Sequence, residues 1–404
     1  MPWIVSQHGA RQHYATPRAF QRQGTLDTFY TDTWAGRAKS LLTHFPGRAK
    51  AFAGRSSSEL PPEKVVAFTL PTLCEIATRP LRVKDPSVEA AHLEWIREGQ
   101  RFCRRVNEHL SHRTLSPKSH AFYGCKSVCL ETLQRVREQG IFTLVDQADP
   151  SRVEEKLVEQ ERGKWPGWEA MTGKVPEAYY ERCAAEWATA STVLVYSAWT
   201  KDAIVEQGVP AEKVMVVPLA FETAVTEAPP PKPSDRPLTV LWLGTVMLRK
   251  GIPYLIEAAR KVQDRNIRFV VAGQILISEK AVASAPKNMQ FIGRVLRDQA
   301  EAVYRSADVF VLPTISDSFA LTQVEAMANG LPVIATKRCG EVVTDGVDGR
   351  IVPVADAESL AAAIAALDDD RALLAEMSTN ARKKARTFSI DSYGDQVRNE
   401  VLMR

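Results

Sequence analysis

The sequence predicts an α/β protein with two domains. Short apolar stretches that fit β-strands alternate with helical stretches of about 12–20 residues, a pattern that gives parallel βαβ units. A proline-rich stretch over 227–237 interrupts this pattern and cannot build a core, so it predicts an interdomain linker. The length of 404 residues fits two or three domains of about 150 residues each. We expect a first domain over 1–222, a linker over 223–237, a second domain over 238–388 and a last helix over 389–404.

Composition and charge favour an ordinary globular protein over a nucleic-acid-binding or membrane-spanning one. Hydrophobic residues make up 45% of the chain and charged residues 25%, as in ordinary globular proteins. The net charge of +4 is too small to indicate nucleic-acid binding. No apolar run approaches the ~20 residues of a membrane span, and the first residues lack the basic lead and apolar region of a signal peptide. We therefore expect a cytoplasmic protein that has no nucleic-acid partner.

The six cysteines are scattered along the chain and show no metal-ligand pattern. Cys125 and Cys129 are four residues apart, but no histidine pair is placed to complete a zinc site. The two Asp-Gly pairs in 345–349 fit a turn, since the acid spacing differs from that of a calcium loop. We expect reduced, buried thiols and no bound metal.

The first half opens with a β-loop-α-β pattern. A strand over 3–5 reaches a loop that holds Gly9, and helical residues 14–23 and a strand near 26–30 follow. Gly9 permits a tight turn and lets the backbone approach a ligand, although the three-glycine dinucleotide fingerprint is absent. Further strands of the first half are expected over 119–123, 141–145 and 192–196.

Two stretches of the first half, 34–55 and 93–113, combine basic and apolar residues. We interpret both as helices that pack an apolar side inward and leave a basic face in water. The alternative is peripheral contact with an anionic membrane on its cytosolic face.

The second half begins with a buried strand over 238–243, a glycine and the loop 246–251. The loop holds Arg249 and Lys250 just before a helix. Lysine supplies a point charge and arginine a planar fork, so the pair fits a clamp for a diphosphate. The alternative is an exposed basic turn.

The strongest pattern lies in the stretch 313–336. An apolar strand over 309–312 runs into a polar loop, and a second apolar strand follows over 332–335. The helix between them ends at Asn329-Gly330 and carries one apolar stripe, made of Leu321, Val324, Met327 and Ala328. Apolar runs on both sides of the loop indicate the carboxyl edge of a parallel sheet, where α/β proteins bind ligands.

Two acids and the start of this helix are candidates for ligand contacts. Asp317 lies in the loop, and Glu325 lies one turn beyond the helix start. The first amides of the helix, near Ala320, Leu321 and Thr322, lack intrahelical acceptors and suit an anionic group such as phosphate. The alternative is that Glu325 only faces solvent.

This stretch resembles the donor-site signature of family 4 glycosyltransferases, also called group 1, which are retaining enzymes of GT-B architecture. The family pattern has two glutamates separated by seven residues, a Phe-Gly pair, a Glu-Ala-Met-Ala run, a glycine and a Pro-Val pair. Asp317 stands at the first glutamate, and Phe319-Ala320 stands at the Phe-Gly pair. The residues that match as they stand are Glu325-Ala326-Met327-Ala328, Gly330 and Pro332-Val333. The resemblance is strong over the second domain and weak over the first, and it implies two Rossmann-like domains facing across a cleft.

The resemblance implies roles for individual residues. Glu325 would accept hydrogen bonds from the ribose hydroxyls, and Asp317 would contact the donor sugar. Lys250 matches the lysine of a family Lys-Gly pair, whereas Thr245 stands where the family has an arginine, so Arg249 would supply the second cation. The other implied donor-binding residues are Gly9, Arg294, Phe319, Ala320, Leu321 and Thr322.

On the acceptor side the resemblance is less specific. His120 would lie near a strand end, where the family often places a histidine beside the acceptor. The alternative for His120 is a structural, hydrogen-bonded role. The polar and aromatic stretch 148–180 would either shape an acceptor pocket or form an insertion with its own helix.

The activity implied is transfer of a sugar, with retention, from a UDP- or GDP-sugar to a glycan, lipid-linked or small-molecule acceptor, as in polysaccharide biosynthesis. No metal or other cofactor is expected, because Arg249 and Lys250 would balance the charge of the departing diphosphate. Asp317, Lys250, Arg249 and His120 are the catalytic candidates. The alternative is a catalytically silent protein of the same fold that binds a sugar nucleotide.

Overall fold

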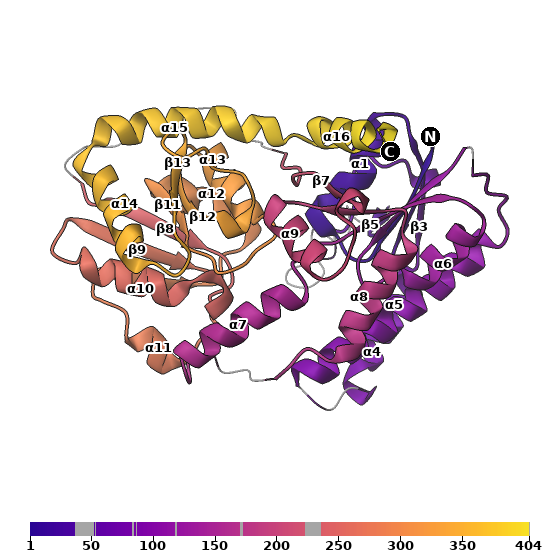
Figure 1. Cartoon of the computed structure of the whole chain (residues 1–404), viewed down its shortest axis with the longest axis horizontal. Coiled ribbons are helices and arrows are strands. Elements are labelled where there is room, and N and C mark those ends of the chain that lie inside the picture. Colours follow the sequence, from indigo (N-terminus) through magenta and orange to yellow (C-terminus); the bar gives the residue numbers. More distant parts are fainter. Residues whose placement is uncertain are drawn as a thin grey trace.

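The computed structural model describes residues 1–36, 52, 54–82, 85, 87–117, 119–169, 173–222 and 236–403. It contains two separate sheets, one with seven strands and one with six, and each is flanked by helices (Figure 1). All paired strands within both sheets run parallel. The predicted α/β class with two domains is therefore confirmed.

The first domain is built on the sheet with strand order β3-β2-β1-β4-β5-β6-β7. Its strands are β1 (Trp3–Gln7), β2 (Leu26–Thr31), β3 (Val65–Ala67), β4 (Ala121–Cys125), β5 (Phe142–Asp146), β6 (Thr192–Val195) and β7 (Val214–Val216). Its helices are α1 (Ala15–Arg22), α4 (Thr69–Arg82), α5 (Val88–Leu110), α6 (Leu130–Glu138), α7 (Arg152–Lys164), α8 (Glu177–Thr189) and α9 (Ala198–Glu206).

The second domain is built on the sheet with strand order β10-β9-β8-β11-β12-β13. Its strands are β8 (Leu238–Leu243), β9 (Ile267–Ala272), β10 (Met289–Gly293), β11 (Val309–Leu312), β12 (Val333–Thr336) and β13 (Gly349–Val352). Its helices are α10 (Ile252–Lys261), α11 (Glu279–Ala283), α12 (Arg297–Ser306), α13 (Leu321–Ala328), α14 (Ala357–Asp369) and α15 (Arg371–Ala385), and α16 (Ile390–Leu402) follows. Helices on both faces bury the central strands β8 and β11, which explains why their residues are nearly all apolar.

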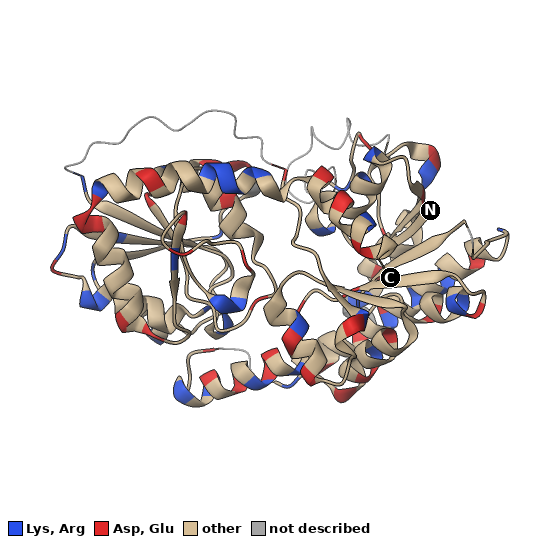
Figure 2. Ribbon diagram, turned by 45° about the horizontal axis from the view of Figure 1, so that its top comes forward, with Lys and Arg blue, Asp and Glu red and all other residues tan. Residues whose placement is uncertain are grey.

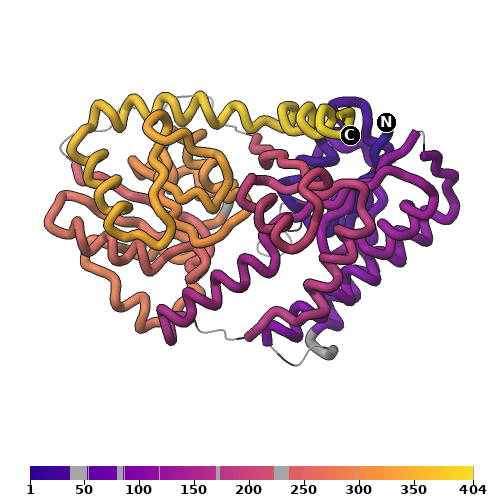
Figure 3. The backbone as a smooth tube through the Cα atoms, viewed as in Figure 1, coloured from indigo at the N-terminus to yellow at the C-terminus, as the bar shows by residue number. Residues whose placement is uncertain are grey.

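The end of the chain returns to the first domain. α15 and α16 follow one another along one side of the molecule, and α16 lies against α1 (Figure 3). The Tyr393 hydroxyl of α16 is 3.0 Å from the Thr16 hydroxyl of α1. Phe388 lies just before α16, and its carbonyl oxygen accepts from the Phe221 amide at 2.6 Å. These contacts fix the last helix on the first domain.

Helix α7 forms a further connection between the domains. It belongs to the first domain by sequence, but it extends toward the second domain below α10 (Figure 1). Trp165 and Trp168, which follow α7, pack against the apolar core of the second domain. The Tyr254 hydroxyl of α10 donates to Glu161 of α7 at 2.7 Å. The stretch 148–180 therefore contains a helix of its own, α7, and its last residues begin α8.

The structure corrects two expectations about the first domain. A turn over 116–120, in which the amides of Ser119 and His120 both donate to the Ser116 carbonyl oxygen, delays the fourth strand until Ala121. His120 therefore precedes β4 instead of lying within the strand. Cys74 is exposed, whereas the other five cysteines are buried as expected.

The basic stretch 93–113 forms most of α5, as expected. Arg101 and Arg105 pair with Glu75 of α4, at 3.1 Å between Arg101 Nε and Glu75 Oε2. Figure 2 shows basic and acidic residues interspersed on the helices of this domain. Most of the other basic stretch, and residues 223–235 of the expected linker, lie outside the described residues. In the part of the chain that is described, no helix is both long and apolar enough to span a bilayer.

Candidate functional site

The carboxyl edges of the two sheets meet. The Trp199 indole of α9, which follows β6, donates to the Ser316 hydroxyl at 3.3 Å, and Ser316 follows β11. The Thr200 hydroxyl donates to Ser318 at 3.0 Å, and the guanidinium of Arg338, after β12, lies 4.8 Å from the Trp199 ring centroid. Loops from both domains therefore border one site, at the edge where parallel sheets bind ligands.

The loop that carries Arg249 and Lys250 is held against the loop after β11. The Arg249 carbonyl oxygen accepts from the Ile315 amide at 2.9 Å and from the Thr314 hydroxyl at 3.0 Å. Gly251 has φ 73°, and a Cβ there would lie 1.8 Å from the Pro313 carbonyl oxygen. The close approach therefore requires glycine at the start of α10.

Lys250, Arg249 and Asp317 form a compact charge cluster. The Lys250 ammonium contacts the Asp317 carboxylate, and Arg249 Nη1 lies 3.8 Å from Asp317 Oδ2. Arg249 Nη1 also donates to the Ser316 carbonyl oxygen at 3.0 Å. Burial and the Arg249 charge lower the pKa of Lys250 to about 7, and the Glu154 charge opposes them. The structure thus brings together three of the four predicted catalytic candidates.

Glu154 of α7 joins this cluster from the other domain. Its Oε2 lies 3.3 Å from Arg249 Nη1 and accepts from the Ser316 hydroxyl at 2.9 Å. Burial raises the pKa of Glu154, and the Arg249 charge opposes this. The sequence identified the stretch around α7 as unusual but gave no reason to select Glu154, because its contacts are all distant in sequence.

The start of α13 adopts an unusual backbone conformation. Ala320 is left-handed, with φ 56° and ψ 81°, at the position where the resembled family has glycine. Phe319 is buried with its ring centroid 5.6 Å from that of Phe388, and its carbonyl oxygen accepts from the Gln323 side chain at 2.8 Å. Leu321 and Thr322 are half-buried in the first turn. Ala320 therefore holds a left-handed conformation that a glycine at this position would adopt without steric cost.

Ala320→Gly is expected to stabilise the protein by about 1 kcal/mol, because glycine adopts a left-handed conformation without the steric cost that alanine bears. Urea unfolding measures the change. Ala375→Gly is the matched control: this residue is exposed within α15, where glycine should lower the free energy of unfolding by about 1 kcal/mol. A less stable Ala320→Gly variant would contradict the assignment of strain to this position.

Glu325 is half-buried on α13 and accepts a hydrogen bond from the Tyr304 hydroxyl at 2.8 Å. Tyr304 is buried at the end of α12, and its pKa is raised by burial and by the Glu325 charge. The alternative in which Glu325 only faces solvent does not fit these contacts. Tyr304 instead fixes the orientation of the carboxylate.

The remaining predicted donor-side residues lie at loops after strands. Thr245 is half-buried after β8, and Arg294 is exposed after β10. Gly9 follows β1 with φ 80°, and its amide donates to Asp32 Oδ1 at 2.7 Å. These three residues lie on the carboxyl edges but are not members of the charge cluster around Arg249.

The structure separates two histidines of the first domain. His120 lies at the amino end of β4, on the sheet edge opposite the site, and its Nδ1 is 3.1 Å from the Ser119 hydroxyl. Its expected place beside the acceptor is therefore wrong, because the site lies at the carboxyl ends of the strands. His8 follows β1 on the site edge, with its ring centroid 5.1 Å from that of Trp95. Burial lowers the pKa of His8, and Asp32 opposes this.

Sequence comparison identifies the second domain. Residues 226–384 match the family of glycosyl transferases group 1. The second domain belongs to this family. Within the described residues, no three histidine, cysteine, aspartate or glutamate side chains are grouped to hold a metal ion.

The chain is also similar in sequence to two bacterial glycosyltransferases. A phosphatidyl-myo-inositol mannosyltransferase of Mycolicibacterium smegmatis is 35% identical over 142 residues, which are 33% of this chain and 37% of the relative. A D-inositol 3-phosphate glycosyltransferase of Corynebacterium glutamicum is 30% identical over 187 residues, which are 40% of this chain and 44% of the relative. Across the relatives compared, the matches span 37% to 52% of the relative's own length.

Solved structures extend the likeness to both domains. The HepE protein of Anabaena, in complex with UDP, superposes over 100% of both chains with a TM-score of 0.64 and 15% identity. Sucrose-phosphate synthase of Thermosynechococcus elongatus covers 100% of this chain and 98% of its own, with a TM-score of 0.66 and 17% identity. The architecture is therefore GT-B, two Rossmann-like domains, as the resemblance implied.

Proposed function

We propose that the protein is a retaining glycosyltransferase that moves a sugar from a nucleotide-diphosphate sugar to an acceptor. The observation that carries the proposal is the Arg249–Lys250 pair, held by Gly251 and Pro313 beside the start of α13. This arrangement lies within the group 1 domain, at the carboxyl edge of its sheet. Two cations beside a helix start suit a diphosphate.

Each group of the site has a distinct part in the proposed reaction. Arg249 and Lys250 stabilise the negative charge that develops on the departing diphosphate, which is where preorganised cations contribute most. In this proposal they supply the charge that a metal ion would otherwise supply, so no metal is needed. Glu325, oriented by Tyr304, accepts hydrogen bonds from the ribose hydroxyls. Asp317 contacts the donor sugar.

The donor we propose is a UDP- or GDP-sugar. HepE was solved with UDP, which supports a UDP-sugar, and a GDP-sugar is the alternative. The acceptor we propose is a glycan, a lipid-linked sugar or a small molecule that binds to the first domain across the cleft.

A thermal-shift panel with UDP, GDP, UDP-glucose and GDP-mannose tests the donor assignment. A ligand at about 100 times its Kd stabilises the folded state by about 2.7 kcal/mol, so the nucleotide of the correct base should raise Tm by about 5 °C or more. Each nucleotide diphosphate is compared with its nucleoside, which lacks the groups that Arg249 and Lys250 would bind. If none of the four compounds changes Tm, the proposed donor site is wrong.

A catalytically silent binding protein of the same fold is the second candidate. It is favoured by the charge cluster, in which Glu154 and Asp317 already neutralise Arg249 and Lys250. Turnover of a radiolabelled sugar nucleotide distinguishes the two functions. Release of labelled sugar to an acceptor or to water supports the enzyme, and binding without release supports the silent protein.

A further inference from the structure

The first domain contains a pocket of about 280 Å³ at the carboxyl edge of its sheet. It lies between the loop after β1, the turn after β4 and the starts of α5 and α8. The side chains that matter for its chemistry are those of Arg11, His92, Trp95, Lys126 and Tyr179. The pocket therefore combines two cations with aromatic walls, and none of these residues belongs to the proposed donor site.

The loop that carries Arg11 is strained. The next three residues, Gln12, His13 and Tyr14, all have left-handed φ angles of 49°, 51° and 62°. Consecutive left-handed residues other than glycine are rare and persist only where the surroundings hold them, which is typical of functional sites. Here the Gln12 side chain donates to the Tyr196 hydroxyl at 3.1 Å, and Tyr14 is buried.

A second strained turn borders the same pocket. Ser127 has φ 63°, and its amide donates to the buried Glu186 carboxylate at 2.6 Å. The Ser127 hydroxyl accepts from the Trp95 indole at 2.7 Å, which fixes the aromatic wall. Both turns therefore position side chains that line the pocket.

Arg11 differs from the other cation of the pocket, Lys126, because its guanidinium has no hydrogen-bonded partner among the described residues. Within the described residues, its guanidinium makes no hydrogen bond or ion pair, although the residue is half-buried. Lys126, in contrast, contacts the Asp149 carboxylate. Burial lowers the pKa of Arg11, and neighbouring groups that include Asp146 outweigh this and raise it. The Asp146 oxygens themselves accept from the Tyr196 hydroxyl and, at 2.9 Å, from the Tyr123 hydroxyl. Five guanidinium donors are thus available to a ligand.

We propose that this pocket binds the anionic group of a sugar acceptor, a phosphate or carboxylate attached to the ring. The inference rests on the proposed function, because it assigns the acceptor class of the same enzyme. A planar guanidinium without a hydrogen-bonded counterion can form two parallel hydrogen bonds, a bidentate contact, with a phosphate or carboxylate. Trp95 and Tyr179 supply aromatic surface for the sugar ring. A neutral sugar would leave the Arg11 charge unpaired in a partly dry site, which is unfavourable.

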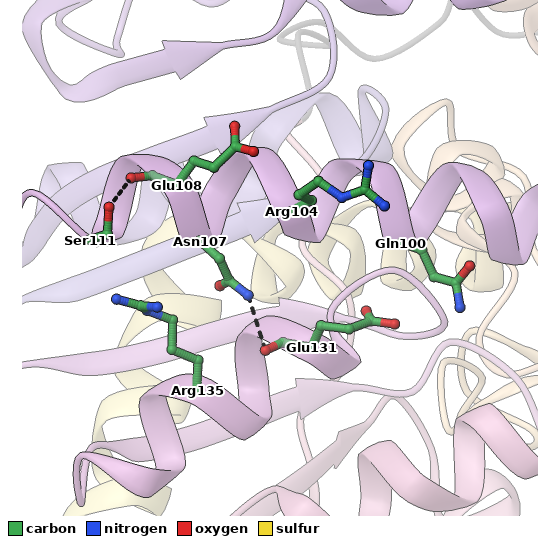
Figure 4. Close-up of a pocket in the computed structure, with 7 residues that line it drawn as sticks. All are labelled: Gln100, Arg104, Asn107, Glu108, Ser111, Glu131 and Arg135. Carbon is green, nitrogen blue, oxygen red and sulfur yellow. Dashed lines mark hydrogen bonds between the residues drawn. The ribbon is translucent and has the colours of Figure 1, made fainter.

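A second pocket offers a matched control. It is a groove of about 650 Å³ between α5 and α6, and it also presents two arginines, Arg104 and Arg135 (Figure 4). Arg104 lies nine residues beyond Trp95 on α5, which at about 100° per residue places it on the opposite face of the helix. Arg104→Gln therefore removes one arginine charge from α5, which borders both pockets, without touching the pocket of Arg11.

The test measures ligand binding to the full chain by isothermal titration calorimetry. The probes are glucose 6-phosphate, glucuronate, glucose and inorganic phosphate. Glucose 6-phosphate and glucuronate should bind at least tenfold more tightly than glucose, and inorganic phosphate should bind more weakly than glucose 6-phosphate because it has no ring. Arg11→Gln should weaken binding of both anionic sugars at least tenfold, Arg11→Lys should lose less, and Arg104→Gln should have no effect.

Several results would overturn the proposal: equal affinity for glucose and the anionic sugars, failure of both anionic sugars to bind, or equal losses in Arg11→Gln and Arg104→Gln. The Tm of each variant shows whether it folds, and Arg11→Lys preserves the test if Arg11→Gln does not fold.

A cosedimentation experiment with phosphatidylinositol vesicles distinguishes two sources of the anion. Cosedimentation that depends on Arg11 would assign the anion to a lipid headgroup, and its absence would assign the anion to a free sugar. UDP and GDP are titrated into the same samples. If a nucleotide binds and the anionic sugars do not, only the proposed pocket is rejected. If the anionic sugars bind and neither nucleotide does, only the proposed donor site is rejected.

Discussion

Lys250→Ala is expected to lower kcat/KM by about 100- to 1000-fold, the effect of removing one preorganised group that stabilises developing charge. The lysine lies in the charge cluster with Asp317, at the end of a loop fixed by Gly251. Its loss leaves Asp317 with Arg249 at 3.8 Å, so the fold should survive. The measurement is steady-state turnover of the sugar nucleotide identified by the thermal-shift panel.

Lys261→Ala provides the control for this variant. Lys261 is the last residue of α10, the helix that follows Lys250, and its ammonium pairs at the surface with Glu358. Exposed pairs of this kind contribute about 0–1 kcal/mol to stability, so kcat/KM should remain at the wild-type value. Wild-type kcat/KM in Lys250→Ala would remove this lysine from the proposed site.

Glu325→Gln is expected to weaken binding of the nucleoside diphosphate by about tenfold to a hundredfold, since hydrogen bonds to a charged group contribute about 1.5–3 kcal/mol. The glutamine can still accept from Tyr304, so the loss reports the carboxylate charge rather than its position. Asp317→Asn should leave this affinity unchanged or tighter. The nucleoside diphosphate lacks the sugar that Asp317 would contact, and the variant releases Lys250 to the diphosphate.

Calorimetry with the nucleoside diphosphate and with the intact sugar nucleotide measures this division of roles. Tyr304→Phe is the companion variant, since it removes the hydrogen bond that orients Glu325 but keeps the carboxylate. It should cause a smaller loss than Glu325→Gln. Equal losses in Glu325→Gln and Asp317→Asn would contradict the division, and no loss in either would place the nucleotide elsewhere.

The second domain could be predicted closely because its signals are local. The apolar strand before Pro313, the stripe along α13 and the stop at Gly330 all occur within a few residues of the elements they define. β11 has the predicted bounds, and Gly330 has φ 80° after the helix as a helix stop requires. Propensity and periodicity suffice where the backbone is determined by its own neighbours.

The first-domain side of the site could not be predicted in the same way. His120 lies at the amino end of β4, whereas the site lies at the carboxyl edge of the sheet. Glu154 reaches Arg249 across 95 residues of sequence, and Arg11 lies in a turn whose left-handed residues carry no glycine signal. Contacts of this kind depend on how the domains pack, which no local spacing encodes.

In the proposed donor complex, the contacts of helix α7 would couple donor binding to the way the two domains are held together. Glu154 shares Arg249 with the place proposed for the diphosphate, while Glu161 and Glu169 hold the same segment to Tyr254 and to the Leu248 amide. A diphosphate that takes Arg249 from Glu154 removes one of these bonds, so a ligand on the second domain changes how firmly the first is tied to it. Linkage makes the effect reciprocal: whatever loosens α7 changes donor affinity by the same factor.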